Sequence, residues 1–286
     1  MTSSKKIKKI NGVAIWFITD SCNYRCSYCF THKSEIKVDD YKLFLKNIRK
    51  KIPRNWRFYI MGGGEPFTHP NFFEIINGLV DSGYRLSIIS NFSAPINKLN
   101  KFFKMTEGNL DYFVASLHLE QAQLQVFIKK IITIKKRFPK FKRFFVNTVA
   151  KKEKMEEAKF LKKIFSAKKI RLTFLRLKKP SPDKEFKEIS YSPEETKIFS
   201  FPSCFYSSPK LTGKLCSSGQ KSAIIDPTGN IFRCISGSNT KQGYLGNLLT
   251  DDIIFYKKPK PCQERFCFCE DCYVTYKRLT TLPMRS

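Results

Sequence analysis

The feature that most constrains the fold is an alternation of strand-like and helix-like segments between residues 13 and 177. Six short runs are rich in the β-branched and aromatic residues that favour strands: residues 13–19, 56–61, 84–90, 110–117, 141–149 and 170–177. Five longer segments between them space their apolar residues as helices do: about residues 38–52, 71–81, 95–106, 121–138 and 152–166. This order predicts an α/β protein, with β/α units around a parallel sheet.

The alternation stops after residue 177. Residues 178–209 contain five prolines, which predicts an irregular linker. Runs at 222–226 and 230–235 flank a turn at 227–229 and predict a β-ribbon, and a cysteine-dense tail follows. A unit this small, with few regular elements, needs a metal to hold it together. We therefore expect a basic tail (1–11), a β/α domain (12–178), a linker (179–209) and a small cysteine-rich β-ribbon domain (210–286).

The chain is strongly basic, with Lys+Arg 53, Asp+Glu 24 and a net charge of +29. Its 27 Phe and 12 Tyr exclude a disordered chain of low hydrophobicity. The lysines either attract nucleic acid, an anionic substrate or an acidic partner, or they only cover solvated faces. The sequence has no arginine-rich run or basic-aromatic motif of the kind single-strand binders use. No apolar run approaches the roughly 18 residues of a membrane helix, so we expect a cytoplasmic protein without membrane contact.

The ten cysteines fall into two groups. Cys22, Cys26 and Cys29 lie within eight residues of one another, and the other seven follow between residues 204 and 272. Disulfides are rare in the cytosol, where clustered cysteines more often bind metal or carry out redox chemistry. The distribution therefore predicts two separate metal sites.

The first group follows the first predicted strand, where parallel β/α folds gather their ligands. Its C-x3-C-x2-C spacing lets three thiolates hold three irons of a [4Fe-4S] cluster and leaves the fourth iron open for an outside ligand. A structural zinc site would instead need a fourth protein ligand, and the nearest candidate is His32.

Residues 22–29 (CNYRCSYC) and residues 62–66 (GGGEP), at the end of the second predicted strand, resemble the cluster motif and the GGEP element of the radical SAM superfamily. The resemblance implies a partial (β/α)6 TIM-like barrel, which agrees with the six strands. It also implies that Cys22, Cys26 and Cys29 ligate a [4Fe-4S] cluster with an open iron site, and that S-adenosylmethionine binds this iron. The reduced cluster then cleaves S-adenosylmethionine to a 5′-deoxyadenosyl radical, which abstracts a hydrogen atom from the substrate.

The same resemblance implies how S-adenosylmethionine is held. Tyr28 lies near the adenine. The methionine amino group is held by the backbone of the glycine element, Gly62, Gly63, Gly64, Glu65 and Pro66. Polar groups at later strand ends reach the ribose or the carboxylate: Ser90, Asn91, Ser116 and Asn147.

Plainer roles remain open for several of these polar residues. Ser90 and Asn91 also suit the start of the turn after the third strand, and Ser116 suits a small core position. His118, at the end of the fourth strand, either touches substrate or is a capped loop histidine. His69 is expected to cap a helix start or to lie at the surface.

In the second group, Cys216-x12-Gly229-x4-Cys234 resembles the opening of the SPASM/twitch extensions of radical SAM enzymes, which bind auxiliary [4Fe-4S] clusters. The later run of cysteines departs from the usual SPASM spacing. One twitch-type cluster needs four thiolates, for which the natural set is Cys216, Cys234, Cys269 and Cys272, with Cys262 and Cys267 as rivals. Two alternatives are a second auxiliary cluster that uses Cys204, Cys262 and Cys267, and a structural zinc knuckle.

These observations predict a radical SAM oxidoreductase or modifying enzyme that acts on a peptide or protein side chain or on a small molecule. It would need an electron donor such as flavodoxin or ferredoxin. The segment before Cys22 is too short for a leader-peptide-binding domain, so a peptide substrate would need a separate recognition protein or would dock on the basic surface. The alternatives are a radical SAM enzyme acting on RNA and a non-catalytic, zinc-stabilised nucleic-acid-binding protein.

Overall fold

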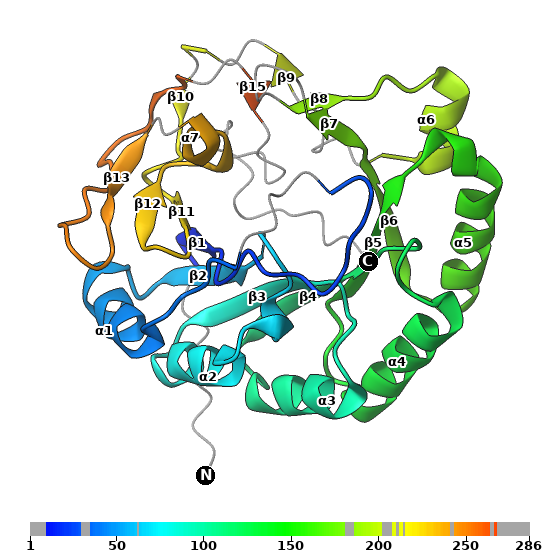
Figure 1. Cartoon of the computed structure of the whole chain (residues 1–286), viewed down its shortest axis with the longest axis horizontal. Helices are drawn as coiled ribbons and strands as arrows, with labels where there is room; N and C mark the ends of the chain where they lie inside the picture. Colours follow the sequence, from blue (N-terminus) through cyan, green and yellow to red (C-terminus); the bar gives the residue numbers. More distant parts are fainter. Residues whose placement is uncertain are drawn as a thin grey trace.

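The computed structural model describes residues 10–29, 35–61, 63–180, 186–201, 208–209, 212–213, 215–240, 243–263 and 266–267. Nine strands form one curved sheet in the order β13-β12-β11-β1-β2-β3-β4-β5-β6 (Figure 1). Their bounds are β1 (Gly12–Trp16), β2 (Trp56–Ile60), β3 (Arg85–Ser90), β4 (Leu110–Leu117), β5 (Phe144–Ala150), β6 (Arg171–Arg176), β11 (Ser222–Ile225), β12 (Asn230–Phe232) and β13 (Tyr244–Asn247). Strands β1 to β6 are parallel, which confirms the α/β prediction.

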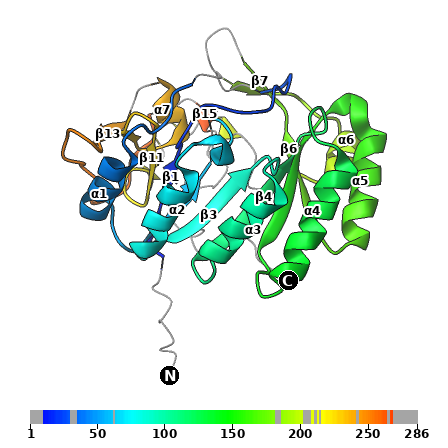
Figure 2. The same cartoon turned by 60° about the horizontal axis from the view of Figure 1, so that its bottom comes forward.

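Five helices connect these six strands and cover the outside of the sheet (Figure 2). They are α1 (Tyr41–Lys51), α2 (Phe72–Asp81), α3 (Ile96–Met105), α4 (Leu124–Arg137) and α5 (Met155–Ala167), with short 3-10 helices η1 (Pro66–Thr68) and η2 (Lys152–Lys154). Helix α1 begins three residues later than predicted because the Asp40 side chain caps it by accepting a hydrogen bond from the Leu43 N–H at 2.9 Å. None of the helices in the described ranges is long and apolar enough to cross a membrane.

The two faces of the sheet bury different clusters of apolar side chains, because successive residues of a strand point to opposite faces. The outer face packs against the helices and contains the large aromatic residues Trp16, Phe58 and Phe113. The Phe113 and Phe144 rings stack with their centroids 5.3 Å apart, so part of the high phenylalanine content is core. The inner face has a smaller cluster made of Val13, Ile15, Tyr59, Tyr112, Ile224 and Phe232.

The segment predicted to be an irregular linker contains regular structure. Strands β7 (Lys178–Pro180) and β8 (Phe186–Glu188) pair as an antiparallel hairpin, and α6 (Pro193–Phe199) follows. Pro193 occupies the start of this helix, and Ser192 and Glu195 form a capping box, in which Ser192 Oγ accepts a hydrogen bond from the Glu195 N–H at 3.1 Å. The expectation of irregular structure is wrong here because a proline in the first turn starts a helix instead of breaking one.

The predicted β-ribbon is present, but it continues the main sheet instead of standing apart. Strands β11 and β12 pair antiparallel, and Gly229 takes a φ of 91° in the turn between them. Strand β11 also pairs in parallel with β1, with Val13 opposite Ser222 and Trp16 opposite Ile225. This pairing satisfies the free backbone groups of the β1 edge, which an unpaired strand would expose.

The remaining elements lie around the ribbon. Helix α7 (Ile235–Thr240) follows β12. Strand β10 (Leu215–Cys216) pairs with β14 (Lys260–Pro261), and β9 (Ser208–Pro209) pairs with β15 (Phe266–Cys267).

Candidate functional site

The three N-terminal cysteines lie on the loop that follows β1. Cys22 and Cys26 are half-buried and Cys29 is exposed, and a turn closed by the Cys29 N–H on the Cys26 carbonyl at 3.1 Å links the last two. Burial raises the pKa of the Cys26 thiol, a hydrogen bond with Tyr28 lowers it, and the neighbouring charges of Cys29 and Cys22 raise it. Within the described ranges, no three His, Cys, Asp or Glu side chains meet around one ion position. A four-iron cluster, by contrast, takes each thiolate on a different iron.

The glycine element packs directly against the start of the cysteine loop. Gly63 has a φ of 62°, and a Cβ atom on Gly63 or Gly64 would collide with Asp20 or Ser21. The Gly64 N–H donates to the Thr19 carbonyl and the Glu65 N–H to the Ser21 carbonyl, each at 2.8 Å. Only glycine permits this close approach of two backbones, so the element sets where the loop begins. Gly62 lies outside the described residues.

Glu65 is buried and joins the ends of β2 and β3. Its carboxylate accepts hydrogen bonds from the Asn91 N–H at 2.6 Å, Ser90 Oγ at 2.7 Å and the Phe67 N–H at 3.2 Å. Burial raises the pKa of Glu65 to about 7, although these three hydrogen bonds oppose the shift. Neighbouring Pro66 begins η1, as is usual for proline in a first helical turn.

Ser90 and Asn91 form the turn after β3, and Asn91 also reaches the cysteine loop. Ser90 Oγ accepts from the Phe92 N–H, and Asn91 Oδ1 accepts from the Ser93 N–H, each at 2.9 Å, as in the turn interpretation. Asn91 Nδ2 donates to Asn23 Oδ1 at 3.0 Å and lies 3.9 Å from the Cys22 sulfur. Asn91 therefore orients a cysteine, a role that the sequence analysis did not assign to it.

The Cys22 sulfur also accepts a hydrogen bond from the Tyr24 N–H at 3.4 Å. N–H donors around a sulfur stabilise its thiolate form, which is the form that binds iron. The residues present therefore fit an iron–sulfur cluster by the chemistry of their donor set.

The segment after β4 contacts the second half of the cysteine loop. Tyr28 Oη and His118 Nδ1 lie 2.8 Å apart with the two rings stacked. Burial raises the pKa of Tyr28, and burial lowers the pKa of His118 to about 4. At neutral pH both groups are uncharged, and the tautomer of the His118 ring decides which of the two donates in this contact.

Glu120 and Lys151 complete this contact, and the sequence analysis singled out neither of them. Both Glu120 oxygens accept from Ser27, Oε2 from its N–H at 2.6 Å and Oε1 from its Oγ at 2.5 Å. Lys151 forms an ion pair with Glu120, and its Nζ lies 4.9 Å from the Tyr28 ring centroid. Partial burial raises the pKa of Glu120, but the hydrogen bonds from Lys151 and Ser27 together outweigh this effect and bring the pKa down to about 2. The sequence contains one signal for Glu120, which is an acidic residue just after a predicted strand in a strongly basic chain.

Ser116 and Asn147 lie side by side on the inner face of the sheet, near the carboxyl ends of β4 and β5. They are register partners, and Asn147 pairs in turn with Thr173 of β6. The residues two positions earlier, Val114 and Phe145, pack on the inner cluster, so these polar side chains lie on the same inner face of the sheet. Ser116 is buried and Asn147 half-buried.

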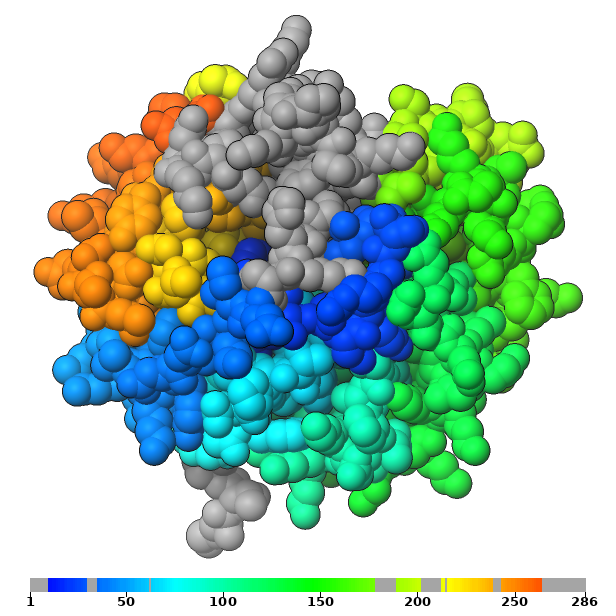
Figure 3. All heavy atoms as spheres, viewed as in Figure 1, coloured from blue at the N-terminus to red at the C-terminus, as the bar shows by residue number. Residues whose placement is uncertain are grey.

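A cavity of about 210 Å³ opens beside Tyr28. Leu119, Thr148 and Val149 contribute to one wall, Glu120 and Lys151 line the cavity near the loop, and residues of α5 and α6 close it. In Figure 3, the blue atoms, which belong to described residues near the start of the chain, lie at the surface facing the viewer, beside the green atoms of the middle of the chain.

Residues 16–147 match the family model of the Radical SAM superfamily. The match begins at the end of β1 and includes the cysteine loop, the GGGEP element and β4. This part of the chain is similar to the radical SAM superfamily domain. That family implies a [4Fe-4S] cluster and S-adenosylmethionine, and the cysteine thiols on the loop after β1 fit the cluster.

Two curated relatives resemble part of this chain. The S-adenosylmethionine-dependent nucleotide dehydratase of Selenomonas ruminantium is 36% identical over 84 residues, which are 28% of this chain and 30% of that protein. The tungsten-containing aldehyde ferredoxin oxidoreductase cofactor-modifying protein of Pyrococcus furiosus is 34% identical over 100 residues, 34% of this chain and 28% of that protein. The matches thus span less than a third of either relative.

The likeness in structure extends beyond the matched region. The solved structure described as native anSMEcpe with bound AdoMet and Cp18Cys peptide has a TM-score of 0.58 and 17% identity. The alignment of the two structures covers 84% of this chain and 78% of the chain in the solved structure. At this identity the comparison shows a shared fold.

The second group of cysteines is only partly described. Cys216, Cys234 and Cys262 are buried, and backbone N–H groups donate to two of their sulfurs, Ser218 to Cys216 at 3.4 Å and Gly237 to Cys234 at 3.2 Å. Cys204, Cys269 and Cys272, like His32 near the first group, lie outside the described residues. Cys267 is described only as part of β15.

The Arg233 side chain joins two of the chain segments that carry these cysteines. Its guanidinium donates to the Pro261 carbonyl at 3.0 Å and to the Lys260 carbonyl at 3.3 Å, so the segment of Cys234 is tied to that of Cys262. Cys216 pairs with Lys260 across β10 and β14. The ligand set of an auxiliary cluster stays a prediction.

His69 is buried in the turn between η1 and α2. Its Nδ1 accepts from the N–H of Asn71, the residue before α2, at 3.0 Å, and its Nε2 donates to the Val38 carbonyl at 2.9 Å. The surface alternative is wrong, because this residue is only 3% exposed, and the capping interpretation is wrong too, because the ring accepts from the residue before the helix and from none of the described N–H groups of its first turn.

Proposed function

We propose that this protein is a radical SAM enzyme in which Cys22, Cys26 and Cys29 hold a [4Fe-4S] cluster whose open iron takes S-adenosylmethionine. The observation that carries the proposal is that side chains and backbone from the ends of β2, β3, β4 and β5 all converge on the cysteine loop. When bound, the cluster and S-adenosylmethionine supply a 5′-deoxyadenosyl radical that removes a hydrogen atom from the substrate.

The chain's own residues bind and orient these groups. Asn91 and the Tyr24 N–H direct donors at the Cys22 sulfur, and Tyr28 hydrogen bonds to Cys26. The cavity beside Tyr28, with Leu119 and Val149 in its lining, suits a flat nucleobase such as adenine.

The other cofactor contacts follow from the same placement. The carbonyl oxygens of Gly63 and Gly64 are acceptors of the kind that the methionine amino group needs, whereas the Glu65 carbonyl already accepts from the Thr68 N–H at 3.0 Å and from its hydroxyl at 2.7 Å. Ser116 and Asn147, which lie on the inner face of the sheet, are placed for the ribose or the carboxylate.

We propose a peptide or protein side chain, or a small molecule, as the substrate. One curated relative is named for acting on a nucleotide, another for modifying a cofactor, and the structural neighbour was solved with a peptide. The proposal includes an electron donor such as flavodoxin or ferredoxin, a separate recognition protein if the substrate is a peptide, and a cytoplasmic location. It also includes an auxiliary [4Fe-4S] cluster on the C-terminal cysteines, supported by the buried Cys216, Cys234 and Cys262.

Anaerobic reconstitution tests this function. The protein is loaded with iron and sulfide, iron per chain is counted, and 5′-deoxyadenosine is measured after addition of reductant and S-adenosylmethionine. We expect about eight irons per chain, the content of two four-iron clusters, together with 5′-deoxyadenosine. A colourless zinc protein that leaves S-adenosylmethionine intact would contradict the proposal.

Two cysteine variants separate the two sites. Cys26→Ala should abolish cleavage of S-adenosylmethionine, because it removes a ligand of the first cluster. Cys234→Ala should retain part of this cleavage and lose product formation. Cleavage that persists in Cys26→Ala shows that the first site is assigned wrongly.

A further inference from the structure

The cysteine loop is held in two halves by different parts of the fold. Contacts to Cys22 and Asn23 come from the end of β3, chiefly Asn91. Contacts to residues 25–28 come from residues 118–121, just after β4: Gln121 Nε2 donates to the Arg25 carbonyl at 3.4 Å, Glu120 accepts from Ser27, and His118 pairs with Tyr28. The distance between the two halves is thus set by how the ends of β3 and β4 are placed.

We propose that Glu120 is a positioning residue that fixes the half of the loop carrying Cys26 and Cys29 for the cluster and S-adenosylmethionine. This inference rests on the proposed function. Ser27 lies directly between Cys26 and Tyr28, and the two Glu120 oxygens accept both its backbone N–H and its hydroxyl. Two bonds to one residue fix its orientation as well as its position.

Through its ion pair with Lys151, the Glu120 carboxylate also holds a positive charge beside the cavity next to Tyr28. Its ion pair with Lys151 holds the ammonium group 4.9 Å from the Tyr28 ring centroid, and Glu120, Lys151 and Tyr28 all line the cavity. Without Glu120, Lys151 loses the one carboxylate that pairs with it among the described residues, and Ser27, next to Tyr28, loses both of its hydrogen bonds to Glu120. Glu120 therefore couples the cysteine loop to the end of β5.

A positioning role and a merely structural role predict different results. The Glu120 side chain is 26% exposed, and an ion pair this close to solvent adds little to overall stability. We therefore expect Glu120→Ala to unfold at nearly the same temperature as the wild type while the loop itself loosens. Glu156→Gln is the matched control, because Glu156 pairs with Lys159 on the surface of α5, away from the loop.

The first measurement uses the protein without its cofactors. Hydrogen exchange resolved to single residues reports the Ser27 amide, which Glu120 accepts directly. We expect exchange at Ser27 to be roughly tenfold or more faster in Glu120→Ala, intermediate in Glu120→Gln, which keeps one oxygen acceptor, and unchanged in Glu156→Gln.

The second measurement uses the reconstituted, reduced protein and follows the electron paramagnetic resonance signal of its cluster as S-adenosylmethionine is added. We expect Glu120→Ala to bind the same amount of iron but to need roughly tenfold more S-adenosylmethionine for the half-maximal spectral change. If Glu120→Ala exchanges at Ser27 and titrates with S-adenosylmethionine as the wild type does, the inference is overturned and the proposed function stands. A wild-type protein that takes up no cluster would contradict the proposed function, and the inference would fall with it.

Discussion

At the level of single residues, two buried titratable side chains stabilise the loop after β2 in opposite protonation states. Burial lowers the pKa of His69 below its ordinary 6.5, so the folded protein prefers the neutral ring that accepts from Asn71 and donates to Val38. Burial raises the pKa of Glu65 to about 7. The stability that His69 contributes is complete above pH 6.5 and is lost as the pH falls, whereas the Glu65 contribution decreases as the pH rises from 4.5 towards 7.

We expect His69→Gln to lose less stability than the wild type when the pH falls from about 7 to about 5, because the variant has no ring to protonate. Urea unfolding at both pH values measures this, and subtracting the two proteins cancels the opposite effect of Glu65. The charged groups that act on His69 are Lys37, Asp39 and Glu74, which both proteins retain. Equal losses in the two proteins would contradict the prediction.

At the level of elements, the ribbon shows how a short motif becomes part of a large sheet. Asp226 Oδ1 accepts from the N–H groups of Thr228 and Asn230, each at 2.9 Å, and so closes the turn at Gly229. The turn aligns β12 with β11, and β11 lies against β1, the strand that leads into the cysteine loop. The stability of the turn is thus connected to the site through one layer of backbone hydrogen bonds.

Gly229→Ala should destabilise the protein by about 2 kcal/mol, because the left-handed φ of 91° strains any other residue and the added methyl group lies close to Asn247 and Leu249. Gly83→Ala is the control, since Gly83 has a φ of 77° but an added methyl group meets no atom within 4 Å. We expect about 1 kcal/mol for this control. Chemical denaturation measures both, and equal losses would show that only the φ matters.

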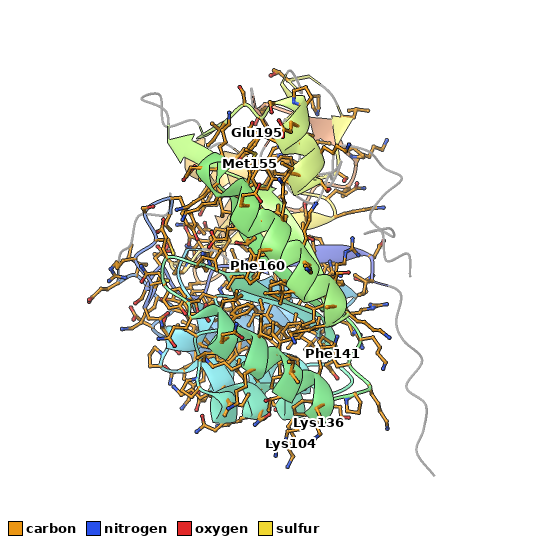
Figure 4. The ribbon with its side chains drawn as sticks, turned by 90° about the vertical axis from the view of Figure 1, so that its right-hand side faces the viewer. Lys104, Lys136, Phe141, Met155, Phe160 and Glu195 are labelled. Carbon is orange, nitrogen blue, oxygen red and sulfur yellow. The ribbon has the colours of Figure 1, made fainter. Side chains whose placement is uncertain are left out.

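At the level of the whole molecule, the positive charge lies in part on the outer helices. Figure 4 shows α4 and α5 side by side on the outside of the sheet, with Lys136 on α4 and Phe160 on α5. Phe160 is 54% exposed among lysines, and both helices present basic residues to solvent. The lysines of α4 and α5 attract anions at long range.

We therefore expect any RNA binding to be weak and to disappear as salt rises from about 50 mM to about 200 mM, because it consists of phosphate contacts alone. Fluorescence anisotropy with a labelled single-stranded RNA measures this. Tight binding that survives the higher salt would favour the alternative in which RNA is the substrate.

The sequence by itself determined the parallel α/β core and the location of the first site, because hydrophobic periodicity and the spacing of Cys22, Cys26 and Cys29 are local properties of the chain. Proline content was misleading between residues 178 and 209, where Pro193 starts a capped helix. The ribbon appeared independent because nothing in its own residues reveals that β1 has a free edge. Pairing between distant strands is a property of the assembled sheet.

Only the tertiary structure decided how the site is held. Ser27 and Glu120 are 93 residues apart, and Asn91 reaches the cysteine loop across 69 residues to Cys22. Such contacts form because parallel strands bring their carboxyl ends to one edge of the sheet, and which side chains meet there depends on register and loop geometry. Short-range patterns therefore name the candidate ligands, whereas the residues that orient these cysteines are set by the packing of the whole sheet and its loops.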